Sequence, residues 1–147
     1  MGALVYVILA AAAVFVSFRA NIIVGIAVTA ALTAYVIYSK YPDIWAIKAR
    51  SAFAEGKFAE AKRRYKKAVD TGRAKPSTRI EYADALMRTG NFEDAEQALN
   101  NLLRYKLKPE IANTAKMRRC MAYFKQNNLE EAYNDAMEIY EIGRAHV

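Results

Sequence analysis

The sequence predicts an all-α protein in which an N-terminal transmembrane helical hairpin precedes an α-solenoid of about three helix–turn–helix repeats. Three observations predict this fold class. The first 39 residues carry one charged side chain, Arg19, between two apolar runs. Apolar residues then recur at three- and four-residue spacing to residue 140, without the alternation typical of strands. A short turn motif returns at intervals of roughly 34 residues, which indicates an internal repeat.

The two apolar runs, Ala3 to Phe18 and Ile22 to Tyr38, have 16 and 17 residues. As helices they would each span roughly 24–26 Å, slightly short of a hydrocarbon core but within the mismatch that a bilayer accepts. One span through both runs would be too long and would leave Arg19 unpaired near the membrane centre. We therefore expect two transmembrane helices near residues 3–18 and 22–38, joined by a turn at 19–21.

A secretory signal peptide is the main competing interpretation of the first run. No Lys or Arg precedes the run, no small-x-small cleavage pattern follows Phe18, and a second apolar run begins almost at once. The hairpin therefore fits best. A cleaved signal followed by one span, and two buried helices of a soluble protein, remain the alternatives.

The charge of the chain is concentrated just beyond the second apolar run. Residues 40–75 hold 11 Lys/Arg and 4 Asp/Glu, or +7, whereas residues 76–147 hold 10 and 11, or −1. Positive residues close to a span tend to stay in the cytoplasm. We therefore expect a multi-pass protein of the cell membrane with its repeat domain cytoplasmic. The single cysteine, Cys120, excludes an intramolecular disulfide and agrees with a reducing compartment.

Gly, Asn and Pro residues punctuate the rest of the chain and delimit six expected helices. Local start patterns support three of them: Thr78 with Glu81 matches a capping box, and Asn91 and Asn128 can cap the helices that follow them. The expected helices lie near residues 43–55, 58–71, 78–89, 92–105, 110–126 and 129–140.

The turns before the second, fourth and sixth of these helices share one pattern. It reads Gly-Lys-Phe-Ala-Glu-Ala61, Gly-Asn-Phe-Glu-Asp-Ala95 and Asn-Asn-Leu-Glu-Glu-Ala132, with the alanines 34 and 37 residues apart. The pattern resembles the tetratricopeptide repeat, a 34-residue helix–turn–helix unit. The resemblance covers about residues 42–140 and divides them into units near 42–75, 76–109 and 113–140. Arg79 at an aromatic position and a longer loop at 106–108 depart from the family pattern.

The last seven residues, 141–147, read Glu-Ile-Gly-Arg-Ala-His-Val, which matches the translation of a common sequencing-library adapter. We expect this tail to be non-native and the natural protein to continue past Tyr140. His146, the single histidine, would then not belong to the protein. No polar capping helix of the kind that closes a solenoid follows the third unit.

The sequence contains no pattern that predicts catalysis, a metal site or a cofactor. The acidic pairs at 93–94 and 130–131 begin helices, where negative charge is favourable. Cys120 occupies a small-residue position of the repeat, so packing is the expected role. We expect a non-enzymatic protein; an alternative is the anchor and regulatory part of a longer membrane enzyme.

The resemblance implies a binding function. In this family the first helix of each unit lines a concave groove that holds an extended or helical peptide, so the implied function is a membrane-anchored scaffold for a protein or peptide partner. Methionines, phenylalanines and cations would suit an acidic or carboxylate-bearing segment. The groove positions carried over are Arg50, Phe53, Ile80, Asp84, Met87, Arg88, Met117, Met121, Phe124 and Lys125.

A basic cluster on the expected helix 58–71 allows three interpretations. Lys62, Arg63, Lys66 and Lys67 can be a solvated face, a surface that contacts anionic lipid, or a nucleic-acid site. Nucleic acid is the least favoured because no recognition module or aromatic platform accompanies the charge. A basic lipid-surface module therefore stays as a further alternative function.

Overall fold

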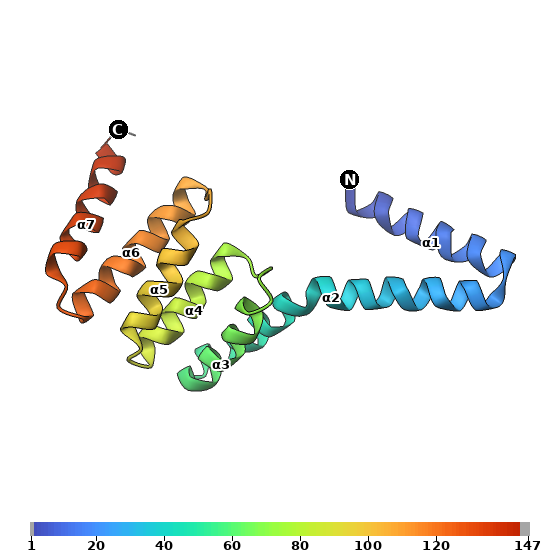
Figure 1. Ribbon diagram of the computed structural model, residues 1–147, viewed down its shortest axis with the longest axis horizontal. Helices are drawn as coiled ribbons and strands as arrows, with labels where there is room; N and C mark the ends of the chain where they lie inside the picture. Colours follow the sequence, from blue (N-terminus) through green and yellow to red (C-terminus); the bar gives the residue numbers. More distant parts are fainter. Residues whose placement is uncertain (1, 145–147) are drawn as a thin grey trace. The chain divides into compact units, whose positions relative to one another are not determined.

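The computed structural model describes residues 2–144, with side chains for residues 8–16, 18–19 and 21–141. The described residues form seven helices and no strand (Figure 1). The chain divides into two compact units, Met1–Tyr41 and Pro42–Val147. The predicted all-α class is confirmed.

The first unit contains helix α1, Gly2–Ala20, and the beginning of helix α2, Ile22–Ala54. Asn21 separates the two helices, and its Oδ1 accepts a hydrogen bond of 2.9 Å from the Ile23 amide. Within the part of the chain that the structure describes, α2 has the length and mean hydropathy, 2.0, of a membrane span. Only 6 % of that apolar window is buried, whereas a core helix would be mostly covered. Insertion of the hairpin stays a prediction.

Helix α2 does not end with the second apolar run. It continues through Pro42 to Ala54, so the break expected before residue 43 is wrong. Proline removes a hydrogen bond from the helix and crowds the preceding turn, at a cost of about 3 kcal/mol. Helix formation is cooperative, and the long helical segments on both sides outweigh this local cost.

The second unit contains the end of α2 and five further helices in three helix pairs. Helices α3 to α7 pack in chain order, and the first helices α4 and α6 also contact each other (Figure 1). The end of α2 shares a core cluster with residues of α3 and α4. This arrangement is the expected solenoid. The five helices are α3, Phe58–Val69; α4, Pro76–Arg88; α5, Phe92–Leu103; α6, Pro109–Lys125; and α7, Leu129–Arg144.

The core of the solenoid is built largely from alanine, which lets helices approach closely. The three repeat alanines, Ala61, Ala95 and Ala132, are 0 %, 0 % and 7 % exposed. Tyr65, Leu99 and Leu102 are the largest fully buried side chains among the described residues, and they belong to the core clusters of the first two repeats. Small residues at the crossings therefore set how closely the helices pack.

The three turns inside the helix pairs have the same backbone structure. Gly56, Gly90 and Asn127 have φ of +76°, +78° and +64°, in the left-handed region where a side chain is costly. Each turn closes with the hydrogen bond of a Schellman motif, in which a backbone amide reaches the carbonyl five residues earlier. These bonds are Lys57 to Ala52, Asn91 to Leu86 and Asn128 to Tyr123, each 2.9 Å.

Two local predictions differ from the structure. The capping box at Thr78 is wrong because α4 begins at Pro76, which is well suited to the first helical position, and Thr78 is buried inside the helix. Asn91 precedes α5, but its side chain makes no capping hydrogen bond. Helix α7 continues past residue 140 to Arg144, and residues 145–147, including His146, lie outside the described residues.

Candidate partner-binding groove

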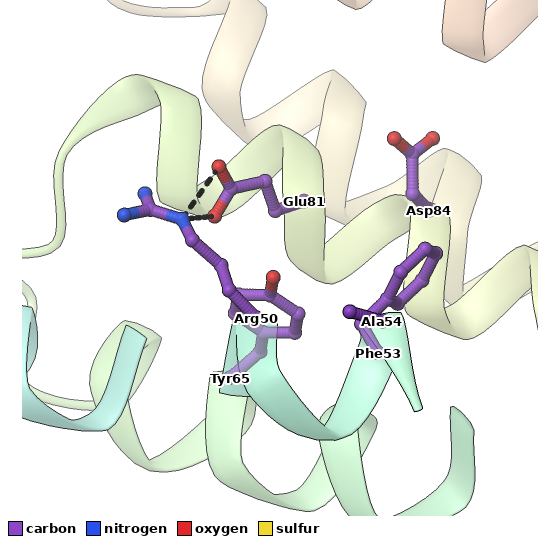
Figure 2. Close-up of a pocket in the computed structure, with 6 residues that line it drawn as sticks. All are labelled: Arg50, Phe53, Ala54, Tyr65, Glu81 and Asp84. Atoms are coloured by element: carbon purple, nitrogen blue, oxygen red, sulfur yellow. Dashed lines mark hydrogen bonds and ion pairs between the residues drawn. The ribbon is translucent and has the colours of Figure 1, made fainter. Parts of the chain in front are cut away.

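The first helices of the repeats, residues 42–54 of α2 followed by α4 and α6, carry a groove. Its first part is a hollow of about 250 Å³ between α2, α3 and α4 (Figure 2). Figure 2 shows the Arg50 guanidinium turned toward the Glu81 carboxylate, with Nε 3.0 and 2.9 Å from the two oxygens. The residues lining this hollow are Arg50, Phe53, Ala54, Tyr65, Glu81 and Asp84.

The polar groups of this first hollow are already engaged with one another. The hydrogen bond that Arg50 donates to the Glu81 carboxylate raises the pKa of Arg50. Burial raises the pKa of the Tyr65 hydroxyl, and the nearby Glu81 charge raises it further. Tyr65 therefore stays neutral and cannot serve as a base near neutral pH.

A second hollow of about 580 Å³ continues along α4 and α6. It shares Phe53 and Asp84 with the first hollow, so the two parts form one groove across all three first helices. Its walls combine apolar side chains with three cations and one carboxylate. The residues lining it are Phe53, Asp84, Met87, Arg88, Phe92, Arg118, Met121 and Lys125.

Asp84 joins α4 to α6 inside the groove. Its Oδ1 lies 2.9 Å from Arg118 Nε, although this buried Nε makes no well-aligned hydrogen bond. Burial raises the pKa of Asp84, while the charges of Arg118 and Arg88 act in the opposite direction. The carboxylate is thus held between two cations.

Seven of the ten residues predicted for a partner groove lie in the walls of the two hollows. Ile80 does not: it is 8 % exposed and packs in the same core cluster as Ala115 of α6. Met117 and Phe124 are 51 % and 63 % exposed but lie outside the walls of the two hollows. The seven are Arg50, Phe53, Asp84, Met87, Arg88, Met121 and Lys125.

The sequence prediction missed four larger lining residues: Tyr65, Glu81, Phe92 and Arg118. Two of them had a detectable signal. Glu81 and Arg118 occupy matching positions in the second and third repeats, and each can pair with an opposite charge on the preceding first helix. A search of the sequence for opposite charges on adjacent first helices would have placed Glu81 and Arg118 in the groove.

The four residues of the basic cluster have different surroundings. Lys62 Nζ donates a 2.8 Å hydrogen bond to Asn91 Oδ1 in the turn of the next repeat. Lys66 pairs with Asp70 on its own helix at 2.8 Å. Arg63 is exposed, and Lys67 Nζ lies 4.3 Å from the centroid of the Trp45 ring. The cluster expected from the sequence is therefore divided among different roles.

No metal-binding group of three or more His, Cys, Asp or Glu side chains occurs among the residues that the structure describes. Cys120 is half-buried, and its Sγ lies 3.2 Å from the Ala132 carbonyl oxygen. Burial raises the pKa of the Cys120 thiol, which favours the unreactive protonated form. These features describe a packing residue.

A tetratricopeptide repeat family model matches residues 52–117, from the end of α2 into α6. The match identifies tetratricopeptide repeats in this part of the chain. No curated protein matches the chain. Tetratricopeptide repeats are scaffolds for protein–protein interaction and are generally non-enzymatic.

Proposed function

We propose that this tetratricopeptide-repeat protein is a membrane-anchored scaffold that binds a partner segment in the groove formed by α2, α4 and α6. The observation that carries the proposal is the continuous hollow across three successive first helices. A groove that crosses several repeats can hold an extended or helical segment along its length, as in other helix-lined recognition sites.

The lining of the groove suggests the chemistry of the segment. Phe53, Met87 and Met121 provide an apolar and adaptable surface. Arg50 and Arg118 already pair with Glu81 and Asp84 across the groove. Two further cations, at positions 88 and 125, remain as excess positive charge. An amphipathic segment with acidic side chains or a free carboxylate would complement this surface.

Two features support anchoring in the cell membrane with the repeats in the cytoplasm. The first part of α2 is apolar and almost fully exposed, so among the described residues it has few of the protein contacts that would explain its composition in a soluble domain. The excess of 11 cations over 4 anions begins directly beyond it, in residues 40–75. Such a distribution favours retention of the charged side in the cytoplasm.

Charge reversal at the groove tests this function. The full chain in detergent or nanodiscs is used to capture proteins from a membrane lysate, and the captured proteins are quantified. Arg88→Glu with Lys125→Glu should lower capture about tenfold, with a larger effect at low salt, because exposed charges are screened as ionic strength rises. Met87→Ala with Met121→Ala should also lower it, through loss of apolar contact.

The matched control reverses two exposed cations away from the groove, Arg63→Glu and Arg104→Glu. This variant has the same change in net charge as the first one and should capture the partner as the wild type does. Circular dichroism establishes that all variants remain helical. Equal capture by the wild type and both groove variants would show that the groove is not the binding site.

A further inference from the structure

The outer face of the first repeat exposes two isoleucines that have no counterpart in the later repeats. Ile44 and Ile47 are 44 % and 63 % exposed. The positions matching Ile44 are Thr78 and Ala115, which are 2 % and 0 % exposed. Small buried residues in the later repeats thus correspond to a large exposed apolar residue in the first.

The position matching Ile47 shows the same contrast. It is Glu81 in the second repeat and Arg118 in the third, and each pairs with a charge on the preceding first helix. Among the residues described in the repeat unit, no first helix precedes that of Ile47. The two isoleucines therefore form an apolar end face of the repeat unit.

The single tryptophan of the chain lies beside this face between two lysines. Trp45 is half-buried, and the centroid of its ring lies 4.3 Å from Lys67 Nζ and 5.3 Å from Lys48 Nζ. The spacing of Ile44, Trp45 and Lys48 places them on adjoining turns of the same side of α2. Apolar, aromatic and cationic groups thus meet on one surface.

The two lysines carry charge that no carboxylate in the described residues neutralises. All four acidic residues of the segment 40–75 form ion pairs with other cations: Asp43 with Lys75, Glu55 with Lys57, Glu60 with Arg64 and Asp70 with Lys66. No described ion pair includes Lys48 or Lys67. This end of the repeat unit is therefore both apolar and positively charged.

We propose that Ile44, Trp45, Ile47, Lys48 and Lys67 form a lipid-docking face that binds anionic headgroups at the cytoplasmic membrane surface. Aliphatic and aromatic side chains favour the boundary between headgroups and acyl chains, while lysines extend their ammonium groups to lipid phosphates. Lys62 and Lys66, which were candidates for lipid contact from the sequence, lie outside this face because Asn91 and Asp70 engage them.

A bilayer fits this face better than a protein partner because of the position of the face in the chain. Five residues lie between Tyr38, at the end of the predicted span, and Ile44. A membrane span that ends so close to this face keeps its side chains near the lipid headgroups, which gives them a high effective concentration there. The inference rests on the membrane anchor of the proposed function and adds a second contact that depends on lipid charge.

Trp45 provides a site-specific probe, since it is the only tryptophan. The full chain is reconstituted in vesicles of phosphatidylcholine alone or with one third phosphatidylglycerol, each with brominated acyl chains as quencher. Selective excitation of tryptophan should show about twofold stronger quenching in the anionic bilayer, and high salt should remove the difference.

Each variant is measured in both bilayers, and the two values are compared for the same protein. A direct effect of a lysine on tryptophan emission is the same in both bilayers and therefore does not affect the comparison. Lys48→Gln with Lys67→Gln should quench equally in both bilayers. Lys66→Gln is the matched control, an exposed lysine on the same helix as Lys67, and should behave as the wild type. Ile44→Ser with Ile47→Ser should reduce quenching in the anionic bilayer.

Flotation with neutral vesicles tests separately whether the chain is anchored in the membrane. A chain that does not float with them lacks the anchor, and the proposed function fails with it. A chain that floats but quenches equally in both bilayers overturns the lipid-docking face alone. A blue shift that depends on protein concentration, independent of lipid charge and bromine, would assign the face to a second copy of the chain and would also overturn the proposal.

Discussion

Overpacking the repeat alanines should destabilise the solenoid in a graded way. Ala61 and Ala95 are fully buried at helix crossings, whereas Ala132 is 7 % exposed on α7, whose outer side chains face solvent. Replacing alanine with leucine adds three carbon atoms at each site. At the two fully buried crossings the strain should lower the free energy of unfolding by about 1–3 kcal/mol. At Ala132 the helix can shift outward, so the cost should be below about 1 kcal/mol.

Urea unfolding of the full chain in mild detergent measures this cost, with helicity followed by circular dichroism. For a domain of this size a slope near 1 kcal/mol per M converts the strain into a fall of the midpoint of about 1–3 M for Ala61→Leu and Ala95→Leu. Ala132→Leu serves as the matched substitution with a small expected shift. Unchanged midpoints at 61 and 95, or an equal loss at all three sites, would refute the packing argument.

Three further changes test other parts of the structure. Gly90→Ala should cost about 1 kcal/mol in urea unfolding, because φ is +78° and nothing lies within 4 Å of an added Cβ, so only backbone strain acts; an unchanged midpoint would contradict the turn geometry. Asp135→Asn removes the negative charge that accepts the 2.5 and 2.8 Å hydrogen bonds from Arg119, and should cost about 3 kcal/mol and speed hydrogen exchange in α7; continued protection of α7 would show that other contacts dock it. Ala20→Cys in a Cys120→Ser background should be labelled from outside intact cells, whereas labelling only after lysis would reverse the proposed orientation.

Much of the solenoid was predictable because its determinants are local. A residue that tolerates positive φ, an apolar residue two positions later and an alanine after three more specify each turn and crossing. Gly56, Gly90 and Asn127 illustrate this, since all three adopt the left-handed conformation that the motif implies. Such determinants need no knowledge of distant contacts, so a single sequence reveals them.

The continuity of α2 was not predictable from the same local rules. Proline and a change of composition near residue 40 both indicate a boundary, and the structure does divide into two units between Tyr41 and Pro42. The backbone nevertheless remains helical through that point. A boundary between units and a break in a helix are separate properties, because a helix depends on hydrogen bonds over several turns on either side.

The charged residues of the groove were only partly predictable because their roles depend on the register between helices. Ile80 and Asp84 lie one turn apart on α4, yet Ile80 is covered by the core cluster that includes Ala115, while Asp84 faces the groove. Arg118 was missed for the same reason. Its position opposite Asp84 follows from the loop before α6, which changes the repeat spacing from 34 to 37 residues.

The two ion pairs that join successive first helices have opposite polarity. Arg50 on α2 pairs with Glu81 on α4, while the matching pair places Asp84 on α4 against Arg118 on α6. Both pairs are partly exposed to solvent, so each contributes about 1 kcal/mol or less to stability. The two pairs have a stronger effect on the order in which the first helices pack. If α6 packed directly on α2, Arg118 would lie against Arg50, and this like-charge contact disfavours the wrong packing order.

The opposite polarity of the two pairs also explains which charges of the groove lie outside them. Each of the two acidic residues on α4 pairs with an arginine of a neighbouring first helix, one on α2 and one on α6. The excess cations, Arg88 and Lys125, lie at the ends of α4 and α6, beside the apolar side chains of Met87 and Met121. The pairs that order the repeats therefore leave no uncompensated carboxylate among the groove-lining residues. We infer that an acidic segment binds at Arg88 and Lys125, which lie outside the two ion pairs that join the first helices, and reversal of both should weaken binding while these two ion pairs remain.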